Sequence, residues 1–451
     1  MDSSPDAARV SRDGSGARPG LVRAIGRFDL TAAVVNGVIG SAIFGMPGLI
    51  AGLVGPLSPL AWVLAGLGIL TMILCFAEVG SRFKEPGGPY LYAREAFGPF
   101  VGFQAGWLTF WIRIFAFAAN VNLFTSYLAQ VLPTAGSGAG RAATLTLLVA
   151  LLTWVNLVGV RQATWTVNAF TIAKLLPLLL LVLLGAGSIS SETMASQTVA
   201  APDWTQAILL LVFAYGGFEA PLIPASEAKD PRRDTAFALL VGTAVIATVY
   251  VLVQLVVVGL VPGVAGETAP VAAAYRVLAG PAGVAFASLA AMVSVYGWAT
   301  GTVLQSPRVL FSMAERQELP GVFGRVHARF HTPYVAILSF SLIGWGLAVS
   351  GTFESNATLS AIVRLVTYGL TCAALPVFRR RLAEPPGFRL PAAGLVVPLG
   401  LGFGLWLLYD RARRAFVGTQ SDLVQAQMLI GLVVLGAVLF YAYAARRRAV
   451  R

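Results

Sequence analysis

The sequence contains little charge and very few cysteine, histidine or lysine residues. Only 12% of its 451 residues are charged, whereas a soluble domain carries about 25%. Two cysteines and two histidines leave no disulfide framework and no cysteine–histidine metal site, so we predict neither a metal nor a cofactor. Basic and aromatic residues are not interleaved as they are in RNA-binding surfaces, which argues against a nucleic acid partner.

Hydrophobic residues dominate instead, at 57% of the chain, with a mean hydropathy of +0.77. A membrane-spanning helix needs about 20 mostly apolar residues. The sequence therefore predicts an all-α polytopic membrane protein with twelve spans. The predicted spans cover residues 30–54, 57–81, 98–132, 141–160, 163–186, 204–227, 234–261, 280–312, 333–351, 357–379, 391–409 and 422–445.

Positive charge alternates between the predicted loops. Arginine and lysine gather before the first span and after the second, fourth, sixth, eighth, tenth and twelfth, while most of the opposite loops are poor in both. Cytoplasmic loops carry such an excess, so both termini are predicted in the cytoplasm, in a cell (inner) membrane and against its lipids. Residues 1–29 and 446–451 are predicted cytoplasmic tails, the first of them disordered. A predicted outer loop with Arg411, Arg413 and Arg414 breaks the pattern.

The first span contains a stretch that resists forming a continuous helix. Residues 36–48 carry four glycines and Pro47. Glycine costs about 1 kcal/mol and proline about 3 kcal/mol in a helix interior, relative to alanine. A broken helix within a bilayer survives only where its free backbone groups line a cavity or hold a ligand. The alternative is a glycine-rich helix packed closely on a neighbour.

The sixth span carries a second interruption. Residues 212–221 contain Gly216, Gly217, Glu219 and Pro221. The break comes five spans after the first, which is typical of an inverted repeat whose halves each begin with a discontinuous helix. We therefore predict a first repeat over residues 30–186 and a second over residues 204–379. Residues 391–445 would form two peripheral helices outside the repeats.

Several separated motifs resemble the amino acid–polyamine–organocation superfamily of permeases. Residues 39–44, Ile-Gly-Ser-Ala-Ile-Phe, resemble its first-span motif, with Ala42 where the family has glycine. Residues 78–98 resemble its second-span and loop signature, and residues 213–233 its sixth-span signature. Residues 297–310 resemble its eighth span. The resemblance implies the fold of LeuT and transport of amino acids or related amines.

An amino acid zwitterion has two opposite charges to satisfy in the middle of the membrane. Free N–H groups at a half-helix N-terminus suit its carboxylate, and unwound carbonyls suit its ammonium. The predicted substrate-binding residues lie at the two breaks and include two aromatic side chains, a gating Phe213 and Trp298. They are Ile39, Gly40, Ser41, Ala42, Ile43, Phe213, Ala214, Tyr215, Gly216 and Trp298.

The third span is expected to supply the pocket for the substrate side chain. Phe110, Ile114 and Phe117 share one helical face. An apolar wall of this kind favours small or neutral amino acids over arginine or a polyamine. The spacing is equally typical of ordinary helix packing.

Ionisable residues within spans are functional candidates. Glu219 is the most central acid, is expected to pair with Arg113 or Arg364, and resembles the acid that is linked to proton sensitivity in related exchangers. Lys174 is the only lysine inside a span, and burying its charge costs at least about 2.5–3.5 kcal/mol. It resembles the fifth-span lysine of proton-coupled relatives, which implies hydrogen bonds to Gly37 or Gly40 and to Ser294. The alternative is a structural lysine paired permanently with carbonyls.

These features predict a secondary active transporter of amino acids, proton-coupled, that works by alternating access around the two broken helices. An exchanger, a polyamine or organocation transporter, and a non-transporting amino acid sensor are the alternatives. A channel would show rings of repeated polar groups. An enzyme is not predicted, because no nucleophile–base set lies in the spans.

Overall fold

The computed structural model describes residues 26–83, 88–159, 164–219, 231–382 and 385–449. Helices make up nearly all of this part of the chain, which contains no β-strand. The helices of the first half are α1 (Arg27–Val38), α2 (Ala42–Val54), α3 (Ser58–Arg82), α4 (Gly88–Phe97), α5 (Pro99–Leu128), α6 (Gly138–Val158), α7 (Thr164–Gly185) and α8 (Ser191–Ala195). The second half contains α9 (Trp204–Ala214), α10 (Pro231–Leu260), α11 (Pro270–Gln305), α12 (Pro307–Glu315), α13 (Tyr334–Ser350), α14 (Phe353–Arg381), α15 (Ala393–Val417) and α16 (Gln420–Ala449).

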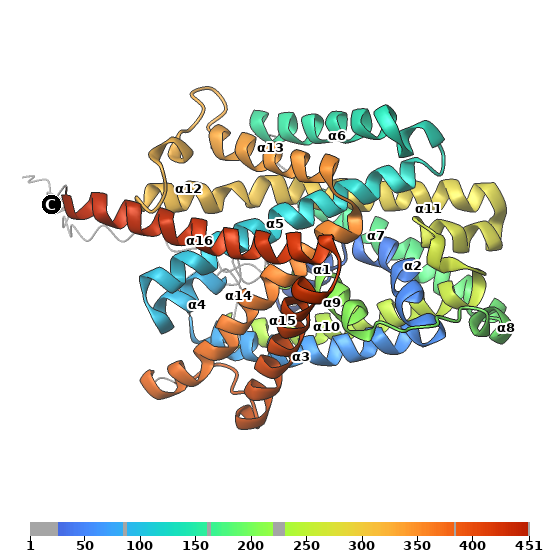
Figure 1. The fold of residues 1–451 in the computed structure, drawn as a ribbon, viewed down its shortest axis with the longest axis horizontal. Coiled ribbons are helices and arrows are strands. Elements are labelled where there is room, and N and C mark those ends of the chain that lie inside the picture. Colours follow the sequence, from blue (N-terminus) through green and yellow to red (C-terminus); the bar gives the residue numbers. More distant parts are fainter. Residues whose placement is uncertain (1–25, 84–87, 160–163, 220–230, 383–384, 450–451) are drawn as a thin grey trace, which may run out of the picture.

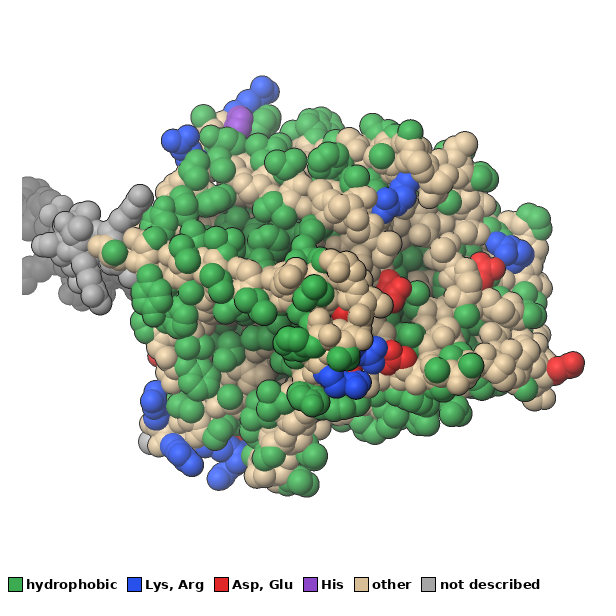
Figure 2. Space-filling model, viewed as in Figure 1, with side chains coloured by type: hydrophobic (Ala, Val, Ile, Leu, Met, Phe, Trp, Pro, Cys, Tyr) green, Lys and Arg blue, Asp and Glu red, His purple; other side chains and the backbone are tan. Residues whose placement is uncertain are grey.

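Eight helical stretches of the described chain are long and apolar enough to cross a membrane, and α9, α13 and residues 174–188 are shorter apolar helices. The all-α, membrane-spanning character of the chain is therefore confirmed. Many large apolar side chains are exposed on the outside of the bundle, including Leu147, Leu183, Leu342 and Leu405. Figure 2 shows a broad hydrophobic area on one face, with basic side chains in separate groups at its left edge, near its centre and on its right. Such a surface suits a lipid environment.

The bundle is built around α5, which packs against α14, α4 and α11, while α3 packs against α10. Figure 1 shows α5 crossing the middle of the molecule, with α15 and α16 on the near side of the bundle. These last two helices contact α3, α5 and α14. Both broken spans lie within the bundle, because α2 packs against α9 and α1 packs against α10.

The predicted start of the eighth span at residue 280 falls inside α11. This helix begins ten residues earlier, at Pro270, and is kinked at Ala279 and Gly280. Gly280 has φ +59° and ψ −147°, and Pro281 follows it. Proline removes a helical donor and restricts the residue before it, so the kink has a local cause. The turns before the kink therefore form a short helical segment that was not predicted.

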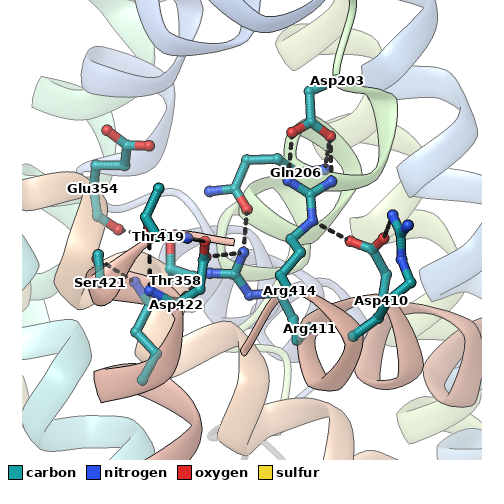
Figure 3. A network of polar contacts seen from close by, with 12 residues as sticks. Asp203, Gln206, Glu354, Thr358, Asp410, Arg411, Arg414, Thr419, Ser421 and Asp422 are labelled. Carbon is teal, nitrogen blue, oxygen red and sulfur yellow. Dashed lines mark hydrogen bonds and ion pairs between the residues drawn. The ribbon is translucent and has the colours of Figure 1, made fainter. Parts of the chain in front are cut away.

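The predicted outer loop with three arginines is helical instead. Arg411, Arg413 and Arg414 lie in the last turns of α15, which extends to Val417. Figure 3 shows two of these arginines turned toward carboxylates from other parts of the chain. Arg414 forms an ion pair with Asp203 at 2.6 Å and with Asp410 at 2.6 Å.

Arg411 completes the network by pairing with Asp422 at 3.0 Å. Arg413 contacts Asp410 at 3.3 Å. Three arginines therefore meet three aspartates within this network, and its formal charge is zero. Free arginines in a loop favour the cytoplasmic side of the membrane, but a neutral cluster has little such effect. The three arginines therefore need not conflict with the predicted orientation. The network also ties α15 and α16 to the start of α9.

Candidate functional site

The first span is broken where the sequence predicts it. Helix α1 ends at Val38, Ile39 is extended with φ −71° and ψ 93°, and α2 begins at Ala42. The N–H groups of Phe44 and Gly45 donate to the Ser41 carbonyl at 3.0 and 3.2 Å. Those of Gly40, Ser41 and Ala42 have no acceptor among the described residues. These free donors sit at the N-terminus of α2, which carries partial positive charge.

The sixth span is also interrupted. Helix α9 ends at Ala214, and residues 215–219 form turns. Gly217 has φ +113°, a conformation that side chains disfavour. The predicted continuation to residue 227 and Pro221 lie outside the described residues. The regular helical part of the sixth span that the structure describes therefore ends at Ala214.

The two breaks touch each other directly. A Cβ atom placed on Gly217 would lie 2.5 Å from the Gly37 carbonyl oxygen. The buried Tyr250 of α10 lies beneath both breaks, because its hydroxyl is 3.3 Å from the Val38 carbonyl oxygen and 3.3 Å from that of Ala214. Sequence patterns gave no signal for Tyr250, which is one of several aromatic residues in apolar spans.

A small cavity lies at this junction, with about 20 Å³ accessible to the centre of a water molecule. This is far below the roughly 300–1,000 Å³ of small-molecule sites, so the surrounding helices would have to move apart to admit a substrate. Of the ten predicted binding residues, Gly40, Ser41, Ala42, Phe213, Gly216 and Trp298 line the cavity. The cavity is also lined by residues that were not among those ten, namely Gly37, Val38, Arg113, Ala116, Asn120, Gly217 and Arg364.

Four predicted binding residues do not line the cavity. Ile39 and Ile43 are buried in the hydrophobic core, and the Ala214 carbonyl faces Tyr250. The Tyr215 hydroxyl donates to the Trp62 carbonyl at 2.9 Å, and the two rings pack edge to face. This side chain therefore belongs to the wall behind the break.

The third-span wall differs from the sequence prediction. Phe110 and Phe117 pack against Phe340 of α13, with ring centroids 5.9 and 5.4 Å apart. The residues of α5 that line the cavity are instead Arg113, Ala116 and Asn120. Their spacing of three and then four residues defines one helical face. The sequence prediction thus chose the apolar face of α5, which packs against a neighbouring helix. The face that lines the cavity is the one with Arg113 and Asn120.

Glu219 forms ion pairs with both Arg113 and Arg364. Arg113 Nη2 and Arg364 Nη1 each lie 3.2 Å from Glu219 Oε1. The Tyr368 hydroxyl donates to Glu219 Oε2 at 2.6 Å, and the Gly217 N–H donates to the same oxygen at 2.9 Å. Both ion pairs considered from the sequence are thus present, on one carboxylate. This cluster fixes the turn after α9 to α5 and α14.

Phe213 lines the cavity and packs edge to face against Phe353 of α14, with ring centroids 6.2 Å apart. Trp298 lies next to the first break, since a Cβ atom on Gly40 would meet its Cδ1 at 3.4 Å. The two aromatic side chains thus border the same space from α9 and α11.

Lys174 contacts the first break, although not through the predicted atoms. Its Nζ donates to Asn36 Oδ1 at 2.9 Å and contacts the Asn36 carbonyl oxygen at 3.4 Å. Asn36 precedes Gly37, in the last turn of α1. Ser294 Oγ has no hydrogen-bond partner among the described residues, so the predicted bond to it is absent. The lysine is buried and binds the carbonyl end of α1, where cations are favoured.

Comparisons with known proteins identify the family of this chain. The family described as "Amino acid permease" matches residues 25–440. The serine/threonine exchanger SteT of Bacillus subtilis (strain 168) is 29% identical, over 80% of this chain and 84% of its own. The branched-chain amino acid permease BcaP of the same organism is 27% identical, over 92% of each chain.

A mammalian protein is comparably similar. The large neutral amino acids transporter small subunit 2 of Mus musculus is 29% identical, over 85% of this chain and 75% of its own. The resemblance seen in the motifs of the first, second, sixth and eighth spans is thereby confirmed. This multi-pass membrane protein belongs to the amino acid permease family.

Proposed function

We propose that the protein is a secondary active amino acid transporter that works by alternating access around the cavity between the two broken helices. The observation that carries this proposal is the direct contact of Gly217 with the Gly37 carbonyl, beside a small cavity. Backbone that is free of helical hydrogen bonds persists at such depth only where it meets protein or a ligand. The family and the printed names of SteT and BcaP support amino acids as substrates.

In this proposal, the substrate carboxylate binds the free N–H groups of Gly40, Ser41 and Ala42. The positive end of the α2 dipole and three unpaired donors suit an anion. The substrate ammonium binds carbonyl oxygens at the ends of α1 and α9, near Val38 and Phe213. Ala42 adds a methyl group at the turn and so limits the space beside the carboxylate.

The matched breaks support twelve spans and a five-plus-five inverted repeat, over residues 30–186 and 204–379, with 391–445 peripheral. Alternating access would then rock one group of helices against the other. Phe213 would act as a gate, because it lines the cavity and its ring packs against Phe353 of α14. Movement of the gate would require the two rings to separate.

Proton coupling is proposed to act through Lys174. Its ammonium binds the end of α1, beside the break. Loss of the proton would remove the positive charge from Asn36 and free the helix end to move. Glu219 is a second candidate group for proton coupling, although its two arginine partners strongly favour the ionised form.

From the charge of the loops, we propose that the protein lies in the inner membrane of the cell and that both of its termini are in the cytoplasm. Cysteines introduced into the loop at 187–203 should react with an impermeant thiol reagent from outside. A cysteine at Lys229, which lies outside the described residues, should not react. Labelling at Lys229 from outside would reverse the orientation and the repeat.

The test of the function is uptake of labelled amino acids by purified protein in proteoliposomes. A transporter accumulates substrate in the lumen, whereas a sensor binds it without uptake. Preloading the lumen with unlabelled substrate separates exchange from symport, because only exchange then accelerates sharply. The name of SteT makes exchange the second candidate. A polyamine is disfavoured as substrate by the two arginines in the cavity wall.

A further inference from the structure

The charges around the cavity do not balance. Two arginines, Arg113 and Arg364, line it, and both pair with the single carboxylate of Glu219. Among the described residues that line the cavity or pair with its arginines, there is no second acid. Within the part of the chain that the structure describes, the cluster therefore carries one uncompensated positive charge in the middle of the bundle. Buried charges in membrane proteins are paired or functional, so this excess indicates an anionic ligand.

Three buried polar atoms of the cavity residues also lack a partner. They are Arg364 Nε, Asn120 Oδ1 and Ser41 Oγ, with no hydrogen bond to any described residue. Their residues are 2%, 2% and 1% exposed, respectively, so solvent does not replace the missing partners. Buried donors and acceptors in native proteins are normally satisfied. Arg364 Nε requires an acceptor, and Asn120 Oδ1 requires a donor.

The zwitterionic part of an amino acid does not account for this excess charge. Its carboxylate and ammonium are neutral together, and under the proposed function they bind the backbone at the two breaks. The guanidinium charge then remains available for a further group. That group has to accept hydrogen bonds and carry negative charge, which describes a carboxylate. The small cavity favours a short side chain.

We infer that the site selects amino acids whose side chain carries an additional negative charge, such as a second carboxylate, and that Arg113 and Arg364 recognise it. This inference rests on the proposed function, since it names the substrate class of that same site. It differs from the neutral-substrate expectation, which rested on Phe110, Ile114 and Phe117. The residues of α5 that line the cavity are instead Arg113, Ala116 and Asn120. The alternative is that Arg364 binds the α-carboxylate of a neutral amino acid.

Isosteric pairs of amino acids test the charge alone. Proteoliposomes at a fixed pH of about 7, where carboxylates are ionised, are given labelled glutamate or glutamine, and aspartate or asparagine. We expect at least about a tenfold preference in kcat/KM for the acid of each pair, equivalent to about 1.4 kcal/mol. Arg113→Gln should bring the ratio near one, because it makes the cluster neutral.

Arg113 is the better position to change, because its side chain is 14% exposed, against 3% for Arg364. Arg364 also donates to Tyr368 at 2.9 Å, so its loss threatens folding. Arg113→Lys keeps the charge and should retain the preference for acids. Arg276→Gln is the matched control, since Arg276 is 50% exposed and pairs with Glu267 outside the cavity. Size-exclusion profiles establish that each variant is folded.

The outcomes separate the two levels of the argument. A preference for acids that Arg113→Gln abolishes and Arg113→Lys keeps supports the inference. Equal or better uptake of the amides by the wild type overturns it and leaves amino acid transport intact. An acid preference that survives in Arg113→Gln overturns the role of the arginines. If no amino acid enters the vesicles, the proposed function itself fails.

Discussion

Gly217 lies against Gly37 so closely that a methyl group on Gly217 would come within 2.5 Å of the Gly37 carbonyl oxygen. The two residues are the nearest points of two broken helices that are separated by almost 180 residues of sequence. Gly217 also has φ +113°, so alanine is strained there regardless of space. The contact holds the carbonyl end of α1 beside the turn that follows α9.

We predict that Gly217→Ala abolishes substrate binding and uptake while the protein still inserts and folds. The added methyl group would push α1 away from the turn and open the cavity. Binding measured by calorimetry in detergent, together with uptake, checks this prediction. Gly301→Ala in α11 is the control, because a Cβ atom there meets nothing within 4 Å. Normal uptake by Gly217→Ala would mean that the contact is not needed.

Lys174 and Asn36 provide the second prediction. Uptake by the wild type should rise with an inward proton gradient and need no sodium. Lys174→Ala should lose this pH dependence, because it removes the only ammonium at the end of α1 among the described residues. Asn36→Ala should weaken it only in part, since the 3.4 Å contact to the Asn36 carbonyl remains. Sodium-dependent uptake that ignores a proton gradient would leave Lys174 a structural residue.

Tyr250→Phe provides the third prediction. The change removes the hydroxyl that lies 3.3 Å from the carbonyl oxygens of both Val38 and Ala214 and leaves the ring in place. A hydrogen bond contributes about 0.5–1.5 kcal/mol, so substrate affinity should fall by about two- to twelvefold. Tyr409→Phe is the control, since Tyr409 is exposed on α15. Unchanged affinity in Tyr250→Phe would show that the hydroxyl does not organise the breaks.

The neutral network of α15 provides the fourth prediction. Arg414→Ala should lower the free energy of unfolding by about 1–3 kcal/mol, because it removes charged hydrogen bonds to Asp203 and Asp410. Arg413→Ala in the same helix should change it little, since Arg413 is 59% exposed, against 24% for Arg414. Thermal unfolding in detergent compares the two. Equal effects would contradict the network.

The same network should make stability depend on pH. Partial burial of Asp203 opposes its ionisation, but hydrogen bonds from Arg414 and from the Gln206 N–H hold the pKa of its carboxyl below the ordinary value. In the unfolded chain an aspartate has a pKa of about 3.9. Because the pKa is lower in the folded protein, the ionised carboxylate stabilises the fold at pH values above about 3.9. This stabilisation is lost as the pH falls through the pKa of the folded state. Unfolding temperatures should therefore drop below about pH 4, and less so in Arg414→Ala.

The sequence was sufficient to predict features that have local causes. Glycine and proline density located the breaks at Gly40 and Gly216, because backbone propensity acts within a few residues. Hydropathy likewise predicted an all-helical membrane protein, because a long apolar run is a local property of the sequence. The pairing of Glu219 with Arg113 or Arg364 was also predicted, because the predicted spans contain few ionisable residues that could pair with it.

Other features depend on contacts between distant segments and could not be read from periodicity. Phe110 and Ala116 lie on different faces of α5, and the packing of α13 against Phe110 leaves the Ala116 face to meet the cavity. Arg414 looked like an unpaired loop charge because its partner Asp203 is 211 residues away. Tyr250 carries no sequence signal for its position beneath both breaks.

Competition by blocked amino acids tests the central claim most directly. The claim is that free backbone groups at the two breaks bind both the α-amino and the α-carboxyl group. The measurement is inhibition of labelled amino acid uptake into proteoliposomes by the free amino acid, its α-amide and its N-acetyl derivative. Each derivative leaves backbone groups unpaired, a loss of roughly 1–3 kcal/mol, so both should compete at least about fivefold more weakly. Equal competition by the blocked and free forms would contradict the account.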